Sequence, residues 1–67
     1  MINSVNNAVK IIDCFTTENP ELGVSEISSQ LNMNKSTVHH LIRTLNKTGI
    51  LVKAPHRKYR LGSRLLR

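Results

Sequence analysis

The chain has 67 residues, enough for one small domain whose core lies near the lower size limit for independent folding. It contains no Trp, one Phe and one Tyr, so Leu, Ile and Val must supply most of that core. A single cysteine excludes an intramolecular disulfide, and the sequence has neither a signal peptide nor an apolar run near the ~18 residues of a membrane span. These features predict a cytoplasmic protein that does not enter a membrane.

The net charge of +6 is concentrated in the second half of the chain. Residues 1–31 contain all four acids and one lysine, which leaves nine of the ten Lys and Arg for residues 32–67. A long stretch of one sign is costly unless a polyanion binds to it. We therefore expect a nucleic acid as the partner; a basic surface that serves only solubility and an anionic membrane are weaker alternatives.

The first predicted element is a helix over residues 5–15. Ile11 and Cys14 widen its apolar face beyond what a single core contact requires, so both are expected to be spare. Because Cys14 belongs to this repeat and no acid–base partner is indicated nearby, a core thiol is favoured over a catalytic one. Apolar side chains recur at helical spacing and form the main face: Val5, Ala8, Val9, Ile12 and Phe15.

A helix-turn-helix pattern follows. Ser25 is placed to cap a short helix over residues 26–30. In the next turn, Asn32 tolerates the left-handed backbone conformation that glycine usually supplies. A third helix is predicted over residues 35–47, with Gly49 as its natural end. The positions where the two helices must touch carry apolar or small side chains: Ile27, Ser28, Leu31, Met33, Val38 and Leu41.

After Gly49 the apolar spacing changes from that of a helix to that of strands. The runs ILVK and KYRL, separated by residues 54–57, predict a small antiparallel hairpin with one apolar and one basic face. The fold class is therefore mainly α with this hairpin: a winged helix-turn-helix of three helices plus wing over residues 1–61. Residues 62–67 are expected to begin another helix, and an apolar pair there with nothing to bury it suggests a fragment of a longer chain.

The third helix has an apolar face and an opposite face of Ser, His, Arg and Lys. A helix of this width fits the DNA major groove, where Arg reads guanine and Ser, Thr or His bonds base edges or phosphate. The wing, about residues 54–58, should reach phosphate or the minor groove through Arg57, with His56 and Lys58 beside it. We expect seven contacts from the helix: Ser36, Thr37, His39, His40 and Arg43 in the groove, and Lys35 and Lys47 on phosphates.

Other functions fit the sequence less well. A winged helix that binds protein without reading DNA often lacks a basic wing, whereas this wing is basic. An enzyme or metal site is disfavoured because His39 and His40 are adjacent and diverge by about 100° on a helix. We expect no cofactor and no metal, and a single Tyr gives little stacking surface for RNA. Whether Arg43 reads a base or meets phosphate stays open, since His40 is also placed to read a base.

These motifs resemble the N-terminal domain of IclR-type bacterial transcriptional regulators over nearly the whole chain. SVNNAVKIIDCF is similar to the family's first helix, ELGVSEISSQLNMNKSTVHHLIRTL to its helix-turn-helix, and GILVK and YRLGSRLL to its wing and linker. The segment KSTVH is the most specific, although the family often has Arg where this chain has His40. The resemblance implies sequence-specific binding to palindromic double-stranded DNA as a homodimer or higher oligomer. It also implies that residues 62–67 begin a linker helix to an absent effector-binding domain, and that a small-molecule effector acts only through this C-terminal domain. The spare Ile11 and Cys14 of the first helix are implied to help dimerisation.

Overall fold

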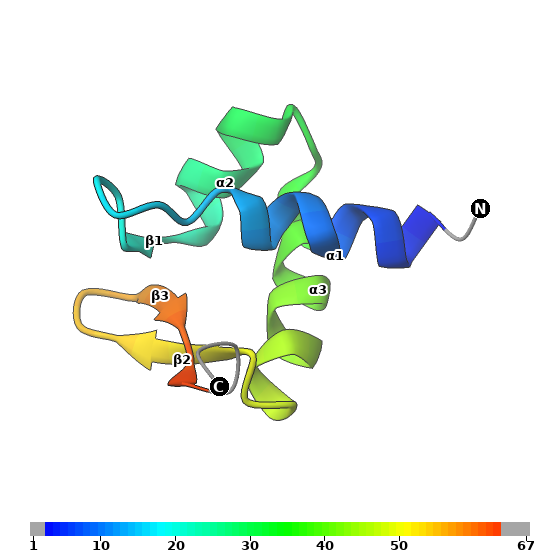
Figure 1. Cartoon of the computed structure of the whole chain (residues 1–67). Coiled ribbons are helices and arrows are strands. Elements are labelled where there is room, and N and C mark those ends of the chain that lie inside the picture. Colours follow the sequence, from blue (N-terminus) through cyan, green and yellow to red (C-terminus); the bar gives the residue numbers. More distant parts are fainter. Residues whose placement is uncertain (1–2, 64–67) are drawn as a thin grey trace.

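The computed structural model describes residues 3–63 and contains three helices and a small sheet (Figure 1). Helix α3 contacts α1, α2 and strand β2, so it is the central element of the fold. Among the described residues, no helix is both long and apolar enough to cross a membrane. The elements in chain order are α1 (Asn3–Asp13), β1 (Glu21–Leu22), α2 (Val24–Leu31), α3 (Lys35–Lys47), β2 (Leu51–Ala54) and β3 (Lys58–Leu61). The predicted winged helix-turn-helix is confirmed.

The wing is larger than the predicted hairpin. Strands β2 and β3 pair as expected, but the two-residue strand β1 pairs antiparallel with β3 and gives the sheet order β1-β3-β2. Leu22 lies opposite Tyr59, so the segment before α2 is joined directly to the wing. A strand of two residues has no alternation that a sequence pattern can reveal. The predicted linker helix falls mostly on residues 64–67, which lie outside the described residues.

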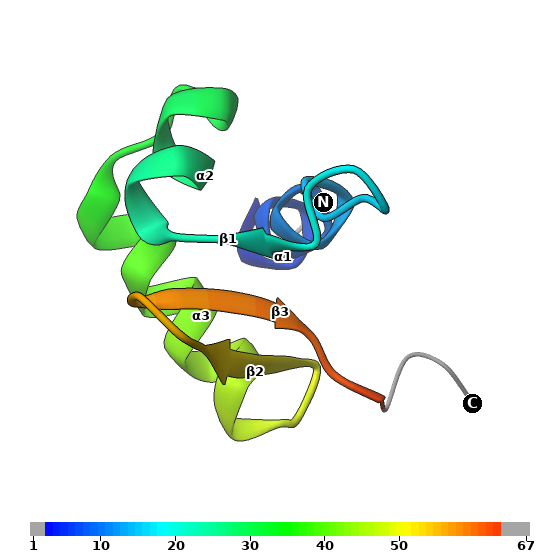
Figure 2. The ribbon, with the colours of Figure 1, turned by 90° about the vertical axis from the view of Figure 1, so that its left-hand side faces the viewer.

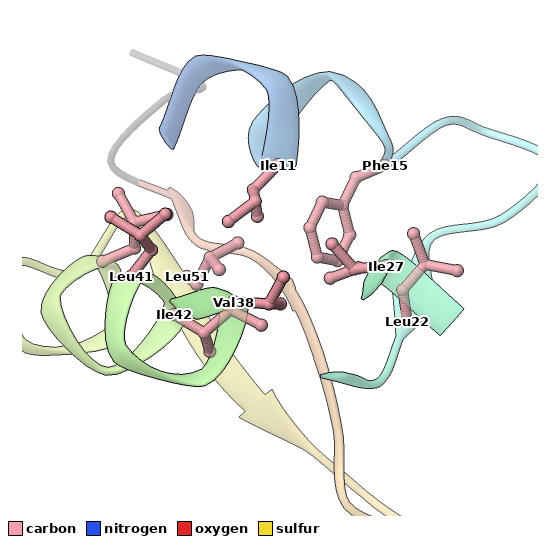
Figure 3. Packing of buried hydrophobic residues seen from close by; sticks show 9 residues of the cluster. Ile11, Phe15, Leu22, Ile27, Val38, Leu41, Ile42 and Leu51 are labelled. Atoms are coloured by element: carbon pink, nitrogen blue, oxygen red, sulfur yellow. The ribbon is translucent and has the colours of Figure 1, made fainter. Parts of the chain in front are cut away.

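One apolar core joins all three helices to the sheet (Figure 3). Its centre consists of fully buried aliphatic side chains, as expected for a chain poor in aromatic residues. The helix-turn-helix prediction for this core is confirmed at Ile27, Val38 and Leu41. The buried hydrophobic residues are Ile11, Phe15, Leu22, Ile27, Val38, Leu41, Ile42, Leu45 and Leu51.

The predicted buried face of α1 was partly wrong. Ile11, expected to be spare, is 0% exposed, whereas Val5 and Val9 are 59% and 49% exposed. The apolar residues cover more than half of the helix circumference, so periodicity alone does not show which edge meets the core. Packing against α3 selects the edge that contains Ile11 and Phe15 and leaves Val5 and Val9 on the surface.

The start of α2 also differs from the prediction. The N-cap is Gly23 rather than Ser25, and the helix begins at Val24. The Glu26 carboxylate accepts a hydrogen bond from the Gly23 backbone N–H at 2.9 Å, which is the backward half of a capping box. Ser25 therefore lies inside the first turn of the helix, with its side chain exposed.

The turn between α2 and α3 has the predicted geometry. Asn32 adopts a left-handed conformation with φ 54°, and the Asn34 side chain caps α3 by accepting a hydrogen bond from Ser36 N–H at 2.7 Å. The buried Ser28 donates its hydroxyl to the Met33 carbonyl oxygen, while Met33 N–H donates back to the Ser28 carbonyl oxygen at 3.0 Å. These two hydrogen bonds between Ser28 and Met33 stabilise the turn and hold the angle between α2 and α3.

Candidate nucleic-acid interface

The exposed face of α3 carries a polar stripe along its whole length. Ser36, His40, Arg43 and Lys47 are all exposed and are spaced four, three and four residues apart. This spacing places them on one side of the helix, opposite the buried Val38 face. At 1.5 Å per residue the stripe is about 16 Å long, comparable to about five base-pair steps of B-DNA. Its length and chemistry suit one half-site of a duplex.

The first turn of α3 contains no acid and begins with the exposed cation Lys35. One of the free N–H groups of this helix end is already satisfied, because Ser36 N–H donates to Asn34. The positive end of the helix dipole and Lys35 nevertheless both favour an anion at this position. Thr37 is exposed on the same turn, one residue beyond Ser36.

The tip of the wing has an unusual backbone. His56 and Arg57 have φ values of 64° and 61°, and Lys58 N–H donates to the Pro55 carbonyl oxygen at 3.4 Å. Two consecutive positive φ values are the pattern of a type I′ hairpin turn, which prefers Asn and Gly. The left-handed conformation costs about 1–2 kcal/mol for an ordinary residue. The exposed residues His56 and Arg57 therefore stand at two positions whose left-handed backbone is unfavourable for residues other than glycine or asparagine.

An open groove of about 700 Å³ separates the wing from the helix-turn-helix. It is lined by the first turn of α2, by His39 of α3 and by the wing residues His56, Arg57 and Lys58. The structure therefore brings together predicted site residues that are up to 19 positions apart in the sequence, from His39 to Lys58. His40 and Ser36 do not line this groove and lie on the more open side of α3.

A second, smaller hollow lies between α3 and the sheet. It brings His39, Arg43 and Lys47 next to Lys53 and Tyr59. Lys53 is exposed, and it is not among the residues that were expected from the sequence to contact DNA. Its cross-strand neighbour is Tyr59, and Leu51 two positions earlier is buried, so strand alternation directs Lys53 toward α3. That alternation, combined with the position of Lys53 in the basic half of the chain, is the signal that identifies it.

One carboxylate lies in the groove among these cations. Glu26 Oε1 is 3.4 Å from Lys58 Nζ, and the two side chains are 46% and 40% exposed. The hydrogen bond from the Gly23 N–H lowers the pKa of Glu26, and the Lys58 ammonium lowers it further. Glu26 therefore stays ionised beside the wing, where it is the ionic partner of the predicted site residue Lys58.

The described residues give little support for two other kinds of site, a metal centre and a reactive cysteine. Between residues 3 and 63, no three or more His, Cys, Asp or Glu side chains are grouped so that they could hold a metal ion. Cys14 is half-buried, its thiol lies 3.4 Å from the Lys10 carbonyl oxygen, and burial together with the nearby Asp13 raises its pKa. A raised pKa reduces the thiolate fraction, which is the reactive form of cysteine.

A comparison with protein families identifies the fold. The IclR helix-turn-helix domain matches residues 4–55, a range that includes α2, α3, the strands β1 and β2, and all of α1 except Asn3. The chain belongs to this family.

Curated relatives agree with this assignment. The HTH-type transcriptional regulator XynR of Escherichia coli is 39% identical over 67 residues, and the glycerol operon regulatory protein of Streptomyces coelicolor is 33% identical over 67 residues. Each alignment covers 98% of this chain but only 27% and 26% of the respective relative. The chain therefore spans about a quarter of the length of these regulators.

Solved structures show the same architecture. An IclR family transcriptional regulator from Brucella abortus superposes with a TM-score of 0.91 at 28% identity, covering 97% of this chain and 26% of that one. An IclR regulator from Alicyclobacillus acidocaldarius gives a TM-score of 0.90 at 26% identity, covering 98% and 27%. The IclR-type chain is thus a DNA-binding domain of the transcriptional-regulator class, and its matched relatives are regulators rather than enzymes. Nothing in these comparisons supports the alternative of a protein-binding module.

Proposed function

We propose that α3 enters the major groove of double-stranded DNA while the wing, about residues 54–58, lies on the phosphate backbone or in the adjacent minor groove. The observation that carries this proposal is the exposed polar stripe of α3 beside a basic wing, with the opposite face of α3 buried in the core. A helix held in this way presents side chains to base edges without exposing its apolar face.

Each predicted residue has a role in this proposal. Ser36, Thr37, His39, His40 and Arg43 face the major groove, and Lys35 and Lys47 meet phosphates at the two ends of α3. On the wing, Arg57 reaches furthest, with His56 beside it and Lys53 added on β2, while Lys58 lies next to them paired with Glu26. Phosphate contacts set the register of the domain on DNA, whereas contacts to base edges give sequence preference. Catalysis, cofactors and metals have no part in the proposal.

We propose further that residues 1–61 work as the DNA-binding domain of a larger cytoplasmic regulator, with residues 62–67 leading to an effector-binding domain. Homodimerisation would place two α3 helices about one helical turn of DNA apart. The exposed Val5 and Val9 on α1 offer an apolar surface for that contact. A structural relative, an IclR homolog from Microbacterium hydrocarbonoxydans, is complexed with 4-hydroxybenzoate, which supports a small-molecule effector for the larger protein.

The test begins with the 67-residue chain and a pool of randomised duplex DNA. We expect weak binding by the monomer at physiological salt, with a dissociation constant of about 10⁻⁴–10⁻⁶ M that rises steeply with salt. Repeated selection should enrich one short motif, and an inverted repeat of that motif should bind a dimerised chain more tightly. Affinity that is independent of salt, with no motif enriched, would refute the proposal and favour the protein-binding module. Nanomolar affinity of a proven monomer would refute the need for a dimer.

A further inference from the structure

Glu26 connects the helix-turn-helix to the wing. A single carboxylate oxygen, Oε1, accepts the Gly23 N–H at 2.9 Å and lies 3.4 Å from Lys58 Nζ. The first contact caps α2, and the second crosses the groove to the first residue of β3. Glu26 is the acid among the residues that line this groove, where the other charged side chains are cations.

The backbone around this ion pair is held by independent contacts. Leu22 pairs with Tyr59 across β1 and β3, and a Cβ placed on Gly23 would lie 3.4 Å from the Arg57 carbonyl oxygen. The backbone at the start of α2 thus lies close to the wing turn, and Figure 2 shows the wing turn just below the start of α2. These contacts keep the backbones of Glu26 and Lys58 close enough for the ion pair to form.

An ion pair of this kind changes the contribution of the wing to the affinity for DNA. A lysine that neutralises one phosphate releases counterions and steepens the dependence of log affinity on log salt by about 0.9. A lysine already neutralised by a carboxylate does not add this increment, and the carboxylate repels phosphates. The wing then has one effective cation fewer than its sequence indicates.

We propose that Glu26 is a positioning residue that holds Lys58 away from the phosphate backbone and thereby restrains sequence-independent affinity for DNA. The inference rests on the proposed placement of the wing on the backbone. Its effect is the same on every duplex, because a lysine ammonium meets phosphates without regard to base sequence. The domain consequently spends less time on nonspecific DNA, while the preferences read by α3 are unaltered.

The first experiment measures salt titrations of Glu26→Gln and wild type on a selected duplex and on a scrambled one. Gln retains a side-chain oxygen for the Gly23 N–H, so the α2 cap is kept while the charge is removed. We expect the salt slope of both duplexes to steepen by about 0.9 and the affinity at 0.1 M salt to rise about 5- to 10-fold. The ratio between the two duplexes should not change.

Two matched variants show whether Lys58 is responsible. Glu18→Gln removes the same charge from an exposed loop position and should leave the slope unchanged. Adding Lys58→Gln to Glu26→Gln should return the slope to that of wild type. If Glu18→Gln steepens the slope as much as Glu26→Gln does, the effect is one of net charge and the proposal is wrong.

Lys58→Gln tests the proposal even if Glu26→Gln folds poorly. Lys58→Gln alone should leave the salt slope of the wild-type protein unchanged, and a decrease of about one unit would overturn the proposal. Arg57→Gln serves as the reference for the wing itself and should lower the slope by about one unit. If Arg57→Gln leaves the slope unchanged, the placement of the wing on DNA fails, and the inference fails with it. If Arg57→Gln lowers the slope while Glu26→Gln has no effect, only the inference is overturned.

Discussion

Replacement of Arg43 by alanine tests whether α3 reads bases. Arg43 is exposed, lies in the polar stripe of α3 and is eight residues beyond Lys35, or about 12 Å along the helix axis. It borders the hollow that faces Lys53 and Tyr59, so its side chain lies between the exposed ridge of α3 and the wing. Two turns into the helix, a side chain as long as that of Arg43 can still reach a base edge in the major groove.

The expected magnitude follows from the geometry of the guanidinium group. Its planar fork can donate to O6 and N7 of one guanine, and such a bidentate contact discriminates by about 1–3 kcal/mol. A difference of this size corresponds to about a 5- to 150-fold change in relative affinity. Arg43→Ala should therefore flatten the preference at one position of the selected motif by this factor, while affinity for scrambled DNA falls by much less. Stability should change little, since the side chain is exposed and lies away from the core.

The measurement is a set of titrations of each variant on the selected motif, on single-base variants of that motif and on scrambled DNA. Arg57→Ala is the matched control, because the same side chain is removed from the wing tip, where we expect a phosphate contact. Lys58 is a poorer control because it is paired with Glu26. If Arg43→Ala weakens all duplexes equally and changes the salt slope as Arg57→Ala does, Arg43 only positions the domain and His40 becomes the candidate base reader.

Three further predictions concern stability and its dependence on pH. Ser28→Ala should destabilise the fold by about 1–2 kcal/mol in urea unfolding, because the Met33 carbonyl oxygen loses its donor; a change under about 0.5 kcal/mol would show that the turn does not need it. Arg57→Gly should raise thermal stability by about 0.5–1 kcal/mol, as relief of a left-handed residue exceeds the added chain entropy, and should weaken DNA binding. The pKa of Glu26 is lowered in the folded state, so as the pH falls the unfolded chain protonates this carboxyl group first. The stabilisation from Glu26 is therefore full above pH 4.5 and is lost below it, and urea unfolding of Glu26→Gln should show a smaller loss of free energy of unfolding below pH 4.5 than wild type.

Local sequence signals determined the helix-turn-helix and most of the candidate interface. The four apolar positions of α3 recur at helical spacing, and the structure buries them all. Asn32 and Gly49 stand where the backbone has positive φ, and each is a residue type that tolerates this conformation. The candidate DNA-contacting residues of α3 could be selected because the opposite, buried face of the same helix determines which side chains are exposed. These features depend on neighbours within a few residues, and the order of residues alone specifies them.

Tertiary packing decided the features that depend on distant neighbours. Strand β1 exists because Leu22 packs in the core and pairs with Tyr59, 37 positions later in the chain. The exposed edge of α1 was settled by contact with α3, since the apolar stripe was too wide for periodicity to decide. The pairing of Glu26 with Lys58 likewise requires the wing to fold back on the start of α2. In the sequence, Glu26 lies in the acidic first half of the chain and Lys58 in the basic second half. Coulomb attraction between them depends on their distance in space, and the fold sets that distance.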